Sequence, residues 1–193
     1  PNNKLAYDFD KLNLKPLFVA QSHQFGYREV EDMQYFSLPT PLTELYFKTA
    51  FKQGQQLDAF FSINTSEQFN FSIAYKGVRS LGAYQHSLTS TGDFRFTTNY
   101  HSKNKRYQIL AHMMALDLLN QENGGLTDES VLLFQSDNNE FRDRGRLDVK
   151  FEDAENELKG FRIFAKHEYE LITKKDSTDL NKLIIGNVIS FED

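Results

Sequence analysis

The chain of 193 residues contains no cysteine and no tryptophan. Without cysteine it can form no disulfide, no thiolate zinc site, no iron–sulfur cluster and no thiol nucleophile. Long apolar runs are also missing, because no window approaches the roughly 18 continuous apolar residues of a membrane-spanning helix. The lack of such runs does not exclude a membrane β-barrel, since only every second residue of its strands faces lipid.

The charge is mildly acidic and evenly spread. There are 27 acidic and 22 basic residues, a formal net charge of −5, and no long block of one sign. Binding to nucleic acid needs clustered Lys and Arg that displace counterions from phosphates. We therefore expect no nucleic-acid partner.

Motifs for catalysis are absent as well. The five histidines are scattered without a His-x-x-x-His pair, and there is neither a Gly-x-Ser-x-Gly elbow nor a phosphate-binding glycine loop. Carboxylate pairs such as Glu44 with Asp58 lie among basic residues, as on a solvated wall. We predict no enzyme activity, no catalytic residue, no metal and no cofactor.

One segment allows two interpretations, a calcium site or a tight loop corner. The stretch "NQENGGLTDES" (120–130) gathers carboxylate and amide oxygens, which are ligands that Ca²⁺ prefers. It lacks the spacing of a calcium-binding loop, and Gly124-Gly125 equally fits a tight corner in left-handed geometry. Both interpretations stand at this point.

Strict alternation is the dominant signal. In "QFNFSIAYKG" (68–77), aromatic and aliphatic residues alternate with small and polar ones, which is typical of a strand with one apolar face. The same pattern predicts about eight strands, at 43–51, 57–63, 68–76, 93–100, 106–116, 147–151, 161–170 and 182–192. The fold class is therefore all-β, an antiparallel meander of consecutive hairpins.

The segment "RYQILAHMMALDLLNQ" (106–121) is less clear, because its good helix formers also fit helical spacing. We favour a strand to about Leu116, with room for a short helical turn after it. Long and short connections alternate from the third strand onward, which places the long ones on one rim. Membrane barrels show this asymmetry.

A family resemblance rests on a series of ordered motifs. They are "SLPTPLTELYFKTAFKQGQQLDAFFSINTSEQFNFSIAYKGVRSLGAY" (37–84), "STGDFRFTTNYHSKNKRY" (90–107) and "NQENGG" (120–125). Together they resemble the "putative porin" family of Bacteroidota outer membranes over roughly residues 35–170. The resemblance implies a transmembrane β-barrel in the bacterial outer membrane, exported with a signal peptide that this chain lacks.

Family members are considerably longer, so the resemblance implies that the barrel continues beyond residue 193. We expect a lead-in at 1–34 that is periplasmic or lies at an edge, and barrel strands over 35–193. Outer-membrane lipid is the expected partner.

The two strand faces then receive different roles. Lining a lumen we expect Lys48, Asp58, Asn70, Lys76, Arg95, Asn99, Arg146, Asp148, Lys150, Arg162 and Lys166. Facing lipid we expect Phe47, Phe61, Phe69, Phe71, Ile73, Tyr75, Phe94, Phe96, Val149, Phe161 and Ile163.

Three functions fit this pattern. The first is a porin for passive diffusion of small hydrophilic solutes. The second is a structural or accessory barrel subunit, or an incompletely closed barrel, bound to an outer-membrane assembly or secretion complex. The third is a soluble barrel or sandwich that turns its aromatic face inward around an apolar ligand.

Overall fold

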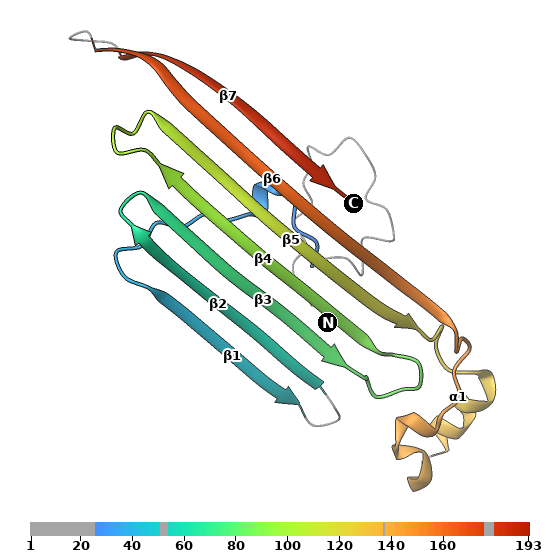
Figure 1. The fold of residues 1–193 in the computed structure, drawn as a ribbon. Coiled ribbons are helices and arrows are strands. Elements are labelled where there is room, and N and C mark those ends of the chain that lie inside the picture. The colour runs from blue at the N-terminus through green and yellow to red at the C-terminus, as the bar shows by residue number, and fades with distance from the viewer. Residues whose placement is uncertain (1–25, 51–53, 137, 176–179) are drawn as a thin grey trace.

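A computed structural model describes residues 26–50, 54–136, 138–175 and 180–193. Its seven strands form one sheet (Figure 1). They are β1 (Leu42–Ala50), β2 (Gly54–Ser66), β3 (Phe69–Ser80), β4 (Thr89–His101), β5 (Tyr107–Glu122), β6 (Ala154–Lys175) and β7 (Leu180–Glu192). The helices are α1 (Asp128–Gln135) and the 3-10 turns η2 (Val30–Asp32), η3 (Asn139–Arg142) and η4 (Arg144–Arg146).

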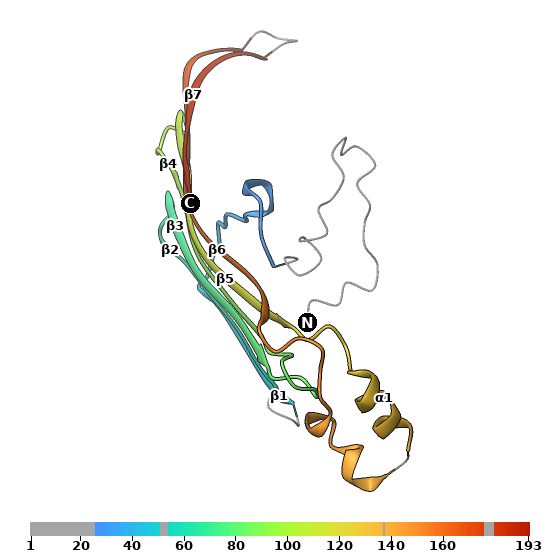
Figure 2. The same cartoon turned by 90° about the vertical axis from the view of Figure 1, so that its right-hand side faces the viewer.

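Each strand pairs antiparallel with the next one in the chain, in the order β1 to β7. The predicted all-β antiparallel meander is therefore confirmed. The sheet is not closed, since β1 and β7 each pair on one side only within the described residues. It is curved, with one concave side (Figure 2), as expected for part of a β-barrel. In the same part of the chain, no helix is both long enough and apolar enough to cross a membrane.

The pairing register runs unbroken across the middle of the sheet. One row of directly opposed residues contains Glu44, Phe60, Ala74, Arg95, Met114, Arg162 and Glu192. Opposed residues point to the same side of a sheet. This row therefore links all seven strands on one face.

The connections are unequal, as the sequence indicated. At one end of the sheet, β2–β3 and β4–β5 are joined over 67–68 and 102–106. At the other end, β3–β4 and β5–β6 are joined over 81–88 and 123–153, and the longer connection carries α1 (Figure 1).

The short helical turn for which the sequence left room after Leu116 does not form, because β5 continues as a strand to Glu122. Leu116 pairs with Asp93 on one side and with Gly160 on the other, and Glu122 pairs with Ala154. The paired edges of β4 and β6 satisfy the backbone of β5, so tertiary pairing overrides helix propensity here.

The predicted strand at 147–151 is also wrong. This segment belongs to the β5–β6 connection, where it pairs with the loop at 123–127 through Lys150 N–H to Gly125 C=O at 2.9 Å and a bridge between Leu126 and Val149. Leu147 and Val149 are buried there at 0% and 5% exposure. Their alternation therefore comes from a short extended loop segment. The described residues form seven strands in place of the expected eight or so.

The expected lead-in at 1–34 lies in the described structure only from residue 26. Residues 26–38, called the strap below, run across the concave side of the sheet (Figure 2). Met33, at 8% exposure, is buried in the strap. The strap contains the single turn η2 and then leads into β1.

Two adjacent glycines allow a test of the β5–β6 connection. Gly124 and Gly125 have φ values of 64° and 87°, and a Cβ would lie 2.4 Å from the Phe151 ring at Gly124 and would meet nothing within 4 Å at Gly125. Alanine costs about 1–2 kcal/mol in left-handed geometry at either site. We expect Gly124→Ala to lower the melting temperature more than the control Gly125→Ala, because it must also displace Phe151. Equal melting temperatures, measured by circular dichroism, would contradict the contact.

Candidate functional site

The concave face of the sheet carries most of the charged strand residues, and β5 adds the buried apolar residues Met114, Leu116 and Leu118 to it. Most residues expected to line a lumen share this face, as the register requires: Lys48, Asp58, Asn70, Lys76, Arg95, Asn99, Arg162 and Lys166. We call it the polar face. Arg146, Asp148 and Lys150 are not on it, because they lie in η4 and the β5–β6 connection, so their expected place on a strand wall is wrong.

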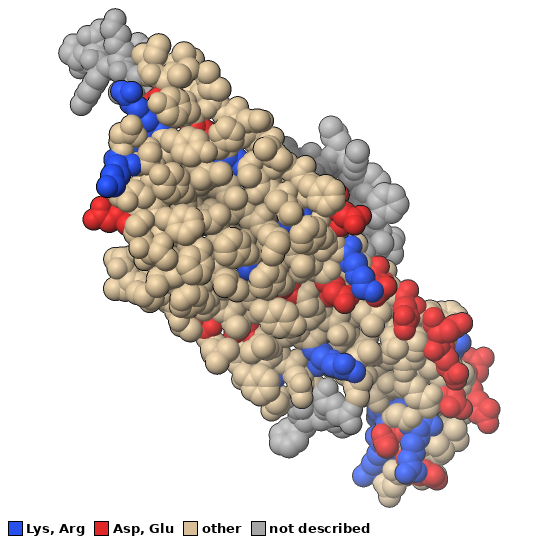
Figure 3. All heavy atoms as spheres, viewed as in Figure 1, with Lys and Arg blue, Asp and Glu red and all other residues tan. Residues whose placement is uncertain are grey.

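The convex face is apolar, and we call it the apolar face. Of the residues expected to meet lipid, ten lie on it: Phe47, Phe61, Phe69, Phe71, Ile73, Tyr75, Phe94, Phe96, Phe161 and Ile163. Several are open to the surroundings, with Phe47 at 61% and Ile163 at 47% exposure. Figure 3 shows this side with few charges over the strands and more toward α1. The prediction that Val149 faces lipid is wrong, because this residue is buried in the β5–β6 connection.

One end of the strap is held by Arg162, whose side chain is 1% exposed. Its guanidinium donates to the Arg28 carbonyl at 2.8 Å and to a Glu192 carboxylate oxygen on β7 at 2.7 Å. The Tyr27 hydroxyl also contacts both Arg162 and Glu192. A buried charge needs such partners, so this cluster ties the strap to β6 and β7.

A second charged cluster joins the same end of the strap to β4. Asp93 of β4, at 6% exposure, accepts from Arg28 at 3.3 Å and pairs with Arg95 at 3.2 Å. One carboxylate thus serves a guanidinium from the strap and another from the sheet. Both basic groups are engaged by this pairing.

The other half of the strap contacts the middle strands. The Tyr35 hydroxyl is hydrogen-bonded to His112 Nδ1 at 2.8 Å, and burial raises the pKa of Tyr35 to about 12. Phe36 packs on Phe60 with ring centroids 4.8 Å apart. The Leu38 N–H donates to the Asn64 side-chain oxygen at 3.1 Å. The strap therefore spans from β7 to β2.

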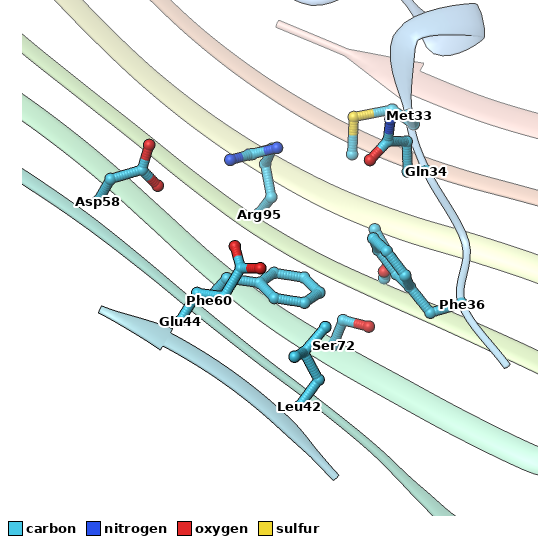
Figure 4. Close-up of a pocket in the computed structure, with 10 residues that line it drawn as sticks. Met33, Gln34, Phe36, Leu42, Glu44, Asp58, Phe60, Ser72 and Arg95 are labelled. Carbon is cyan, nitrogen blue, oxygen red and sulfur yellow. The ribbon is translucent and has the colours of Figure 1, made fainter. Parts of the chain in front are cut away.

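A cavity of about 320 Å³ lies between the strap and the polar face (Figure 4). Strap residues on its wall are Met33, Gln34 and Phe36, and sheet residues are Leu42, Glu44, Asp58, Phe60, Ser72, Arg95 and Thr97. The wall combines two aromatic rings, two carboxylates, one guanidinium and two hydroxyl groups. It offers hydrogen bonding and charge to a small polar solute.

Several residues that hold the strap were missed by the sequence predictions, among them Tyr27, Arg28, Asp93, His112 and Glu192. Asp93 and Glu192 share the polar parity of their strands, so alternation could have identified them. Tyr27 and Arg28 lie where the sequence alternates poorly, and no local signal places them on the sheet.

No group of three or more His, Cys, Asp or Glu side chains in the described ranges could hold a metal ion. At the proposed calcium segment, the Asn123 side chain is engaged by protein groups. It accepts from Gly125 N–H at 3.0 Å and donates to the Gln85 carbonyl at 3.2 Å. Gly124 and Gly125 are left-handed, as the loop-corner interpretation requires.

Comparison with known proteins bears on what such a two-faced sheet does. A family model described as "Putative porin" matches residues 1–193, the whole chain. The chain belongs to this porin family. Neither a curated protein nor a solved structure matches it. Porins are a non-enzymatic class.

Arg162→Met should release the strap. Hydrogen bonds to charged groups contribute about 1.5–3 kcal/mol each, which corresponds to roughly tenfold to hundredfold in an opening equilibrium. We expect amide hydrogen exchange over 26–38 to accelerate by at least that factor in Arg162→Met. Lys166→Met is the matched control, because Lys166 lies on the same face of β6 and pairs only with Glu168 at 2.8 Å among the described groups. Unchanged exchange in Arg162→Met would show that Arg162 does not hold the strap.

Proposed function

We propose that this chain forms the wall of an outer-membrane β-barrel through which small hydrophilic solutes diffuse passively. The observation that carries the proposal is the separation of the two faces in a chain of a porin family. The curved sheet turns most of its charged strand residues inward and an apolar, aromatic face outward. Membrane barrels have this arrangement around a water-filled interior.

Strand length supports a membrane location. A transmembrane strand needs about 9–11 residues. The strands β2, β3 and β4 have 13, 12 and 13 residues, and β5 has 16. The apolar band along them, including Phe61, Ile73 and Tyr75 at 36–41% exposure, would meet lipid in the outer membrane of a bacterium of the Bacteroidota. The polar face would then line the solute path.

A second function is favoured by the sheet edges. Within the described residues, β1 and β7 each present a row of backbone groups without a strand partner. Such edges are templates for further strands. A structural or accessory role in an outer-membrane assembly or secretion complex would place a partner's strand there. Native mass spectrometry in mild detergent separates the two functions, because a lone species speaks against an accessory subunit.

Conductance tests the porin function directly. Full-length protein in a planar lipid bilayer should give stepwise single-channel currents that rise with salt concentration, because ions would pass through water-filled space. Protein-free bilayers made with the same detergent are the control. No current at any voltage would refute passive diffusion.

A charge on the apolar face should oppose insertion into lipid. We expect Ile73→Arg to destabilise the protein in lipid vesicles. Its free energy of unfolding should fall by about 2–4 kcal/mol, the cost of Arg near the bilayer midplane. Gln56→Arg is the matched control, since Gln56 lies on the polar face opposite Val78. Urea-dependent folding into vesicles measures both variants. A larger loss for Gln56→Arg would reverse the assignment of the two faces.

A further inference from the structure

The apolar face changes character toward the end of the sheet that carries the long connections. We propose that a groove there, beside the opposed glycines Gly77 and Gly92, binds the headgroup of a phosphorylated glycolipid of the outer leaflet. The chemical class is that of lipid A, a phosphorylated disaccharide with acyl chains. This inference rests on the membrane location in the proposed function. It concerns the lipid side of the wall, away from any solute path.

The groove lies where the lipid-crossing part of β3 ends. Along this strand the apolar face runs from Phe69 to Tyr75 and continues with Gly77 and Arg79. The stretch from Phe69 to Arg79 has 11 residues, and a tilted strand crosses a bilayer with about 9–11 residues. Figure 3 shows the uncharged area giving way to charged atoms toward α1. Gly77 and Arg79 therefore lie at the boundary between acyl chains and headgroups.

This end of the sheet would face the outside of the cell. The connections over 81–88 and 123–153 both leave the sheet here. In membrane barrels the longer loops are extracellular and the short turns are periplasmic. The outer leaflet of a bacterial outer membrane consists largely of phosphorylated glycolipid, so molecules of this class would surround the groove.

Two directly opposed glycines create the groove. Gly77 of β3 pairs with Gly92 of β4, so neither strand places a side chain on the apolar face at this point. A glycine inside a strand weakens it and often marks the close approach of another molecule. The space has a volume of about 370 Å³, within the range of small-molecule sites, roughly 300–1,000 Å³. Its wall includes Tyr75, Ser90, Gly92, Phe94, Ala115 and Asp117.

The Tyr75 side chain leans over the glycine pair. A Cβ at Gly77 would lie 3.0 Å from the Tyr75 hydroxyl oxygen, and a Cβ at Gly92 would lie 3.6 Å from it. The hydroxyl therefore points from the apolar band toward the polar end of β3. Tyrosines at a membrane interface lie in this way, with the ring in the apolar layer and the hydroxyl among headgroups. The ring is 41% exposed, so it offers a flat surface to a sugar.

Two groups of opposite charge lie at the polar end of the groove. Asp117 is on its wall, and Arg79 is directly opposite the wall residue Ser90. Neither charged side chain makes an ion pair or a hydrogen bond among the described residues. Lys159, opposite Asp117, is engaged by Glu157 at 2.6 Å. Arg79 and Asp117 are two strands apart, which is about 10 Å and leaves room for a headgroup between them.

These groups match the parts of a phosphorylated glycolipid. The Arg79 guanidinium can donate two hydrogen bonds to one phosphate group. The Asp117 carboxylate accepts from sugar hydroxyls, and the hydroxyls of Ser90 and Tyr75 both donate and accept. Phe94 continues the groove into the apolar band, where acyl chains would lie. A free sugar phosphate lacks these chains and should bind more weakly.

Lipid A is the probe for the charged groups. Full-length protein in detergent is titrated with lipid A, and native mass spectrometry counts the bound copies. Arg79→Gln with Asp117→Asn should weaken binding about tenfold or more, which corresponds to about 1.4 kcal/mol, close to one hydrogen bond to a charged group. The matched control is Arg106→Gln with Glu67→Gln, which removes the same charges from exposed connections at the opposite rim. Unchanged affinity in the groove variant overturns the site.

A side chain at Gly92 tests the shape of the groove. The Cβ of Gly92→Val would make an ordinary contact of 3.6 Å with the Tyr75 hydroxyl oxygen, so the strand should still form. Ala111→Val is the control, because Ala111 is on the same face in the middle of the apolar band. We expect only Gly92→Val to lose lipid A binding, while both variants keep the circular dichroism spectrum of the parent protein. Binding retained by Gly92→Val overturns the groove.

Two further ligands test the glycolipid assignment. Phosphatidylethanolamine and glucosamine phosphate should each bind about tenfold more weakly than lipid A, because the first lacks the sugar and the second lacks the acyl chains. Equal binding of either overturns the assignment. Since binding in detergent needs no current, protein that binds lipid A without conducting would keep this site and lose the porin function. Protein that conducts without binding lipid A would lose only the site.

Discussion

The antiparallel register of the sheet is the constraint on which the rest of the structure depends. Side chains alternate between faces with a period of two, so a slip of one residue would send every apolar side chain to the polar face. The row from Glu44 to Glu192 keeps all seven strands in one phase. Because of it, the charged and the aromatic residues of separate strands become two continuous surfaces.

Charged side chains on the concave face need hydrogen-bond or ion-pair partners where the strap covers them and excludes water. Arg162 has lost nearly all contact with solvent and depends on Glu192, Tyr27 and the Arg28 carbonyl. Asp93 likewise holds Arg28 and Arg95. The strap thus supplies polar partners to the sheet, and the sheet fixes the strap in return.

The strand predictions were correct where apolar and polar residues alternated over a whole paired strand. They were wrong where the hydrophobic pattern of a segment did not match its backbone pairing. At 147–151 the alternation of Leu147 and Val149 came from burial in a loop, which a strand pattern cannot distinguish. In β5, good helix formers suggested a turn after Leu116, but two paired neighbours extended the strand to Glu122. Both errors arise because the hydrophobic pattern of a segment does not show which backbone groups of other segments will pair with it.

The sequence by itself determined the two-faced strands, the unequal connections and the family, because each of these is written in residue order. Only the tertiary structure decided that residues 26–38 cross the concave face and that Tyr27, Arg28 and Tyr35 meet Arg162, Asp93 and His112. Those partners are separated by at least 65 positions. Contacts at such separation form because residues 26–38 fold back across the concave face, for which local spacing carries no signal.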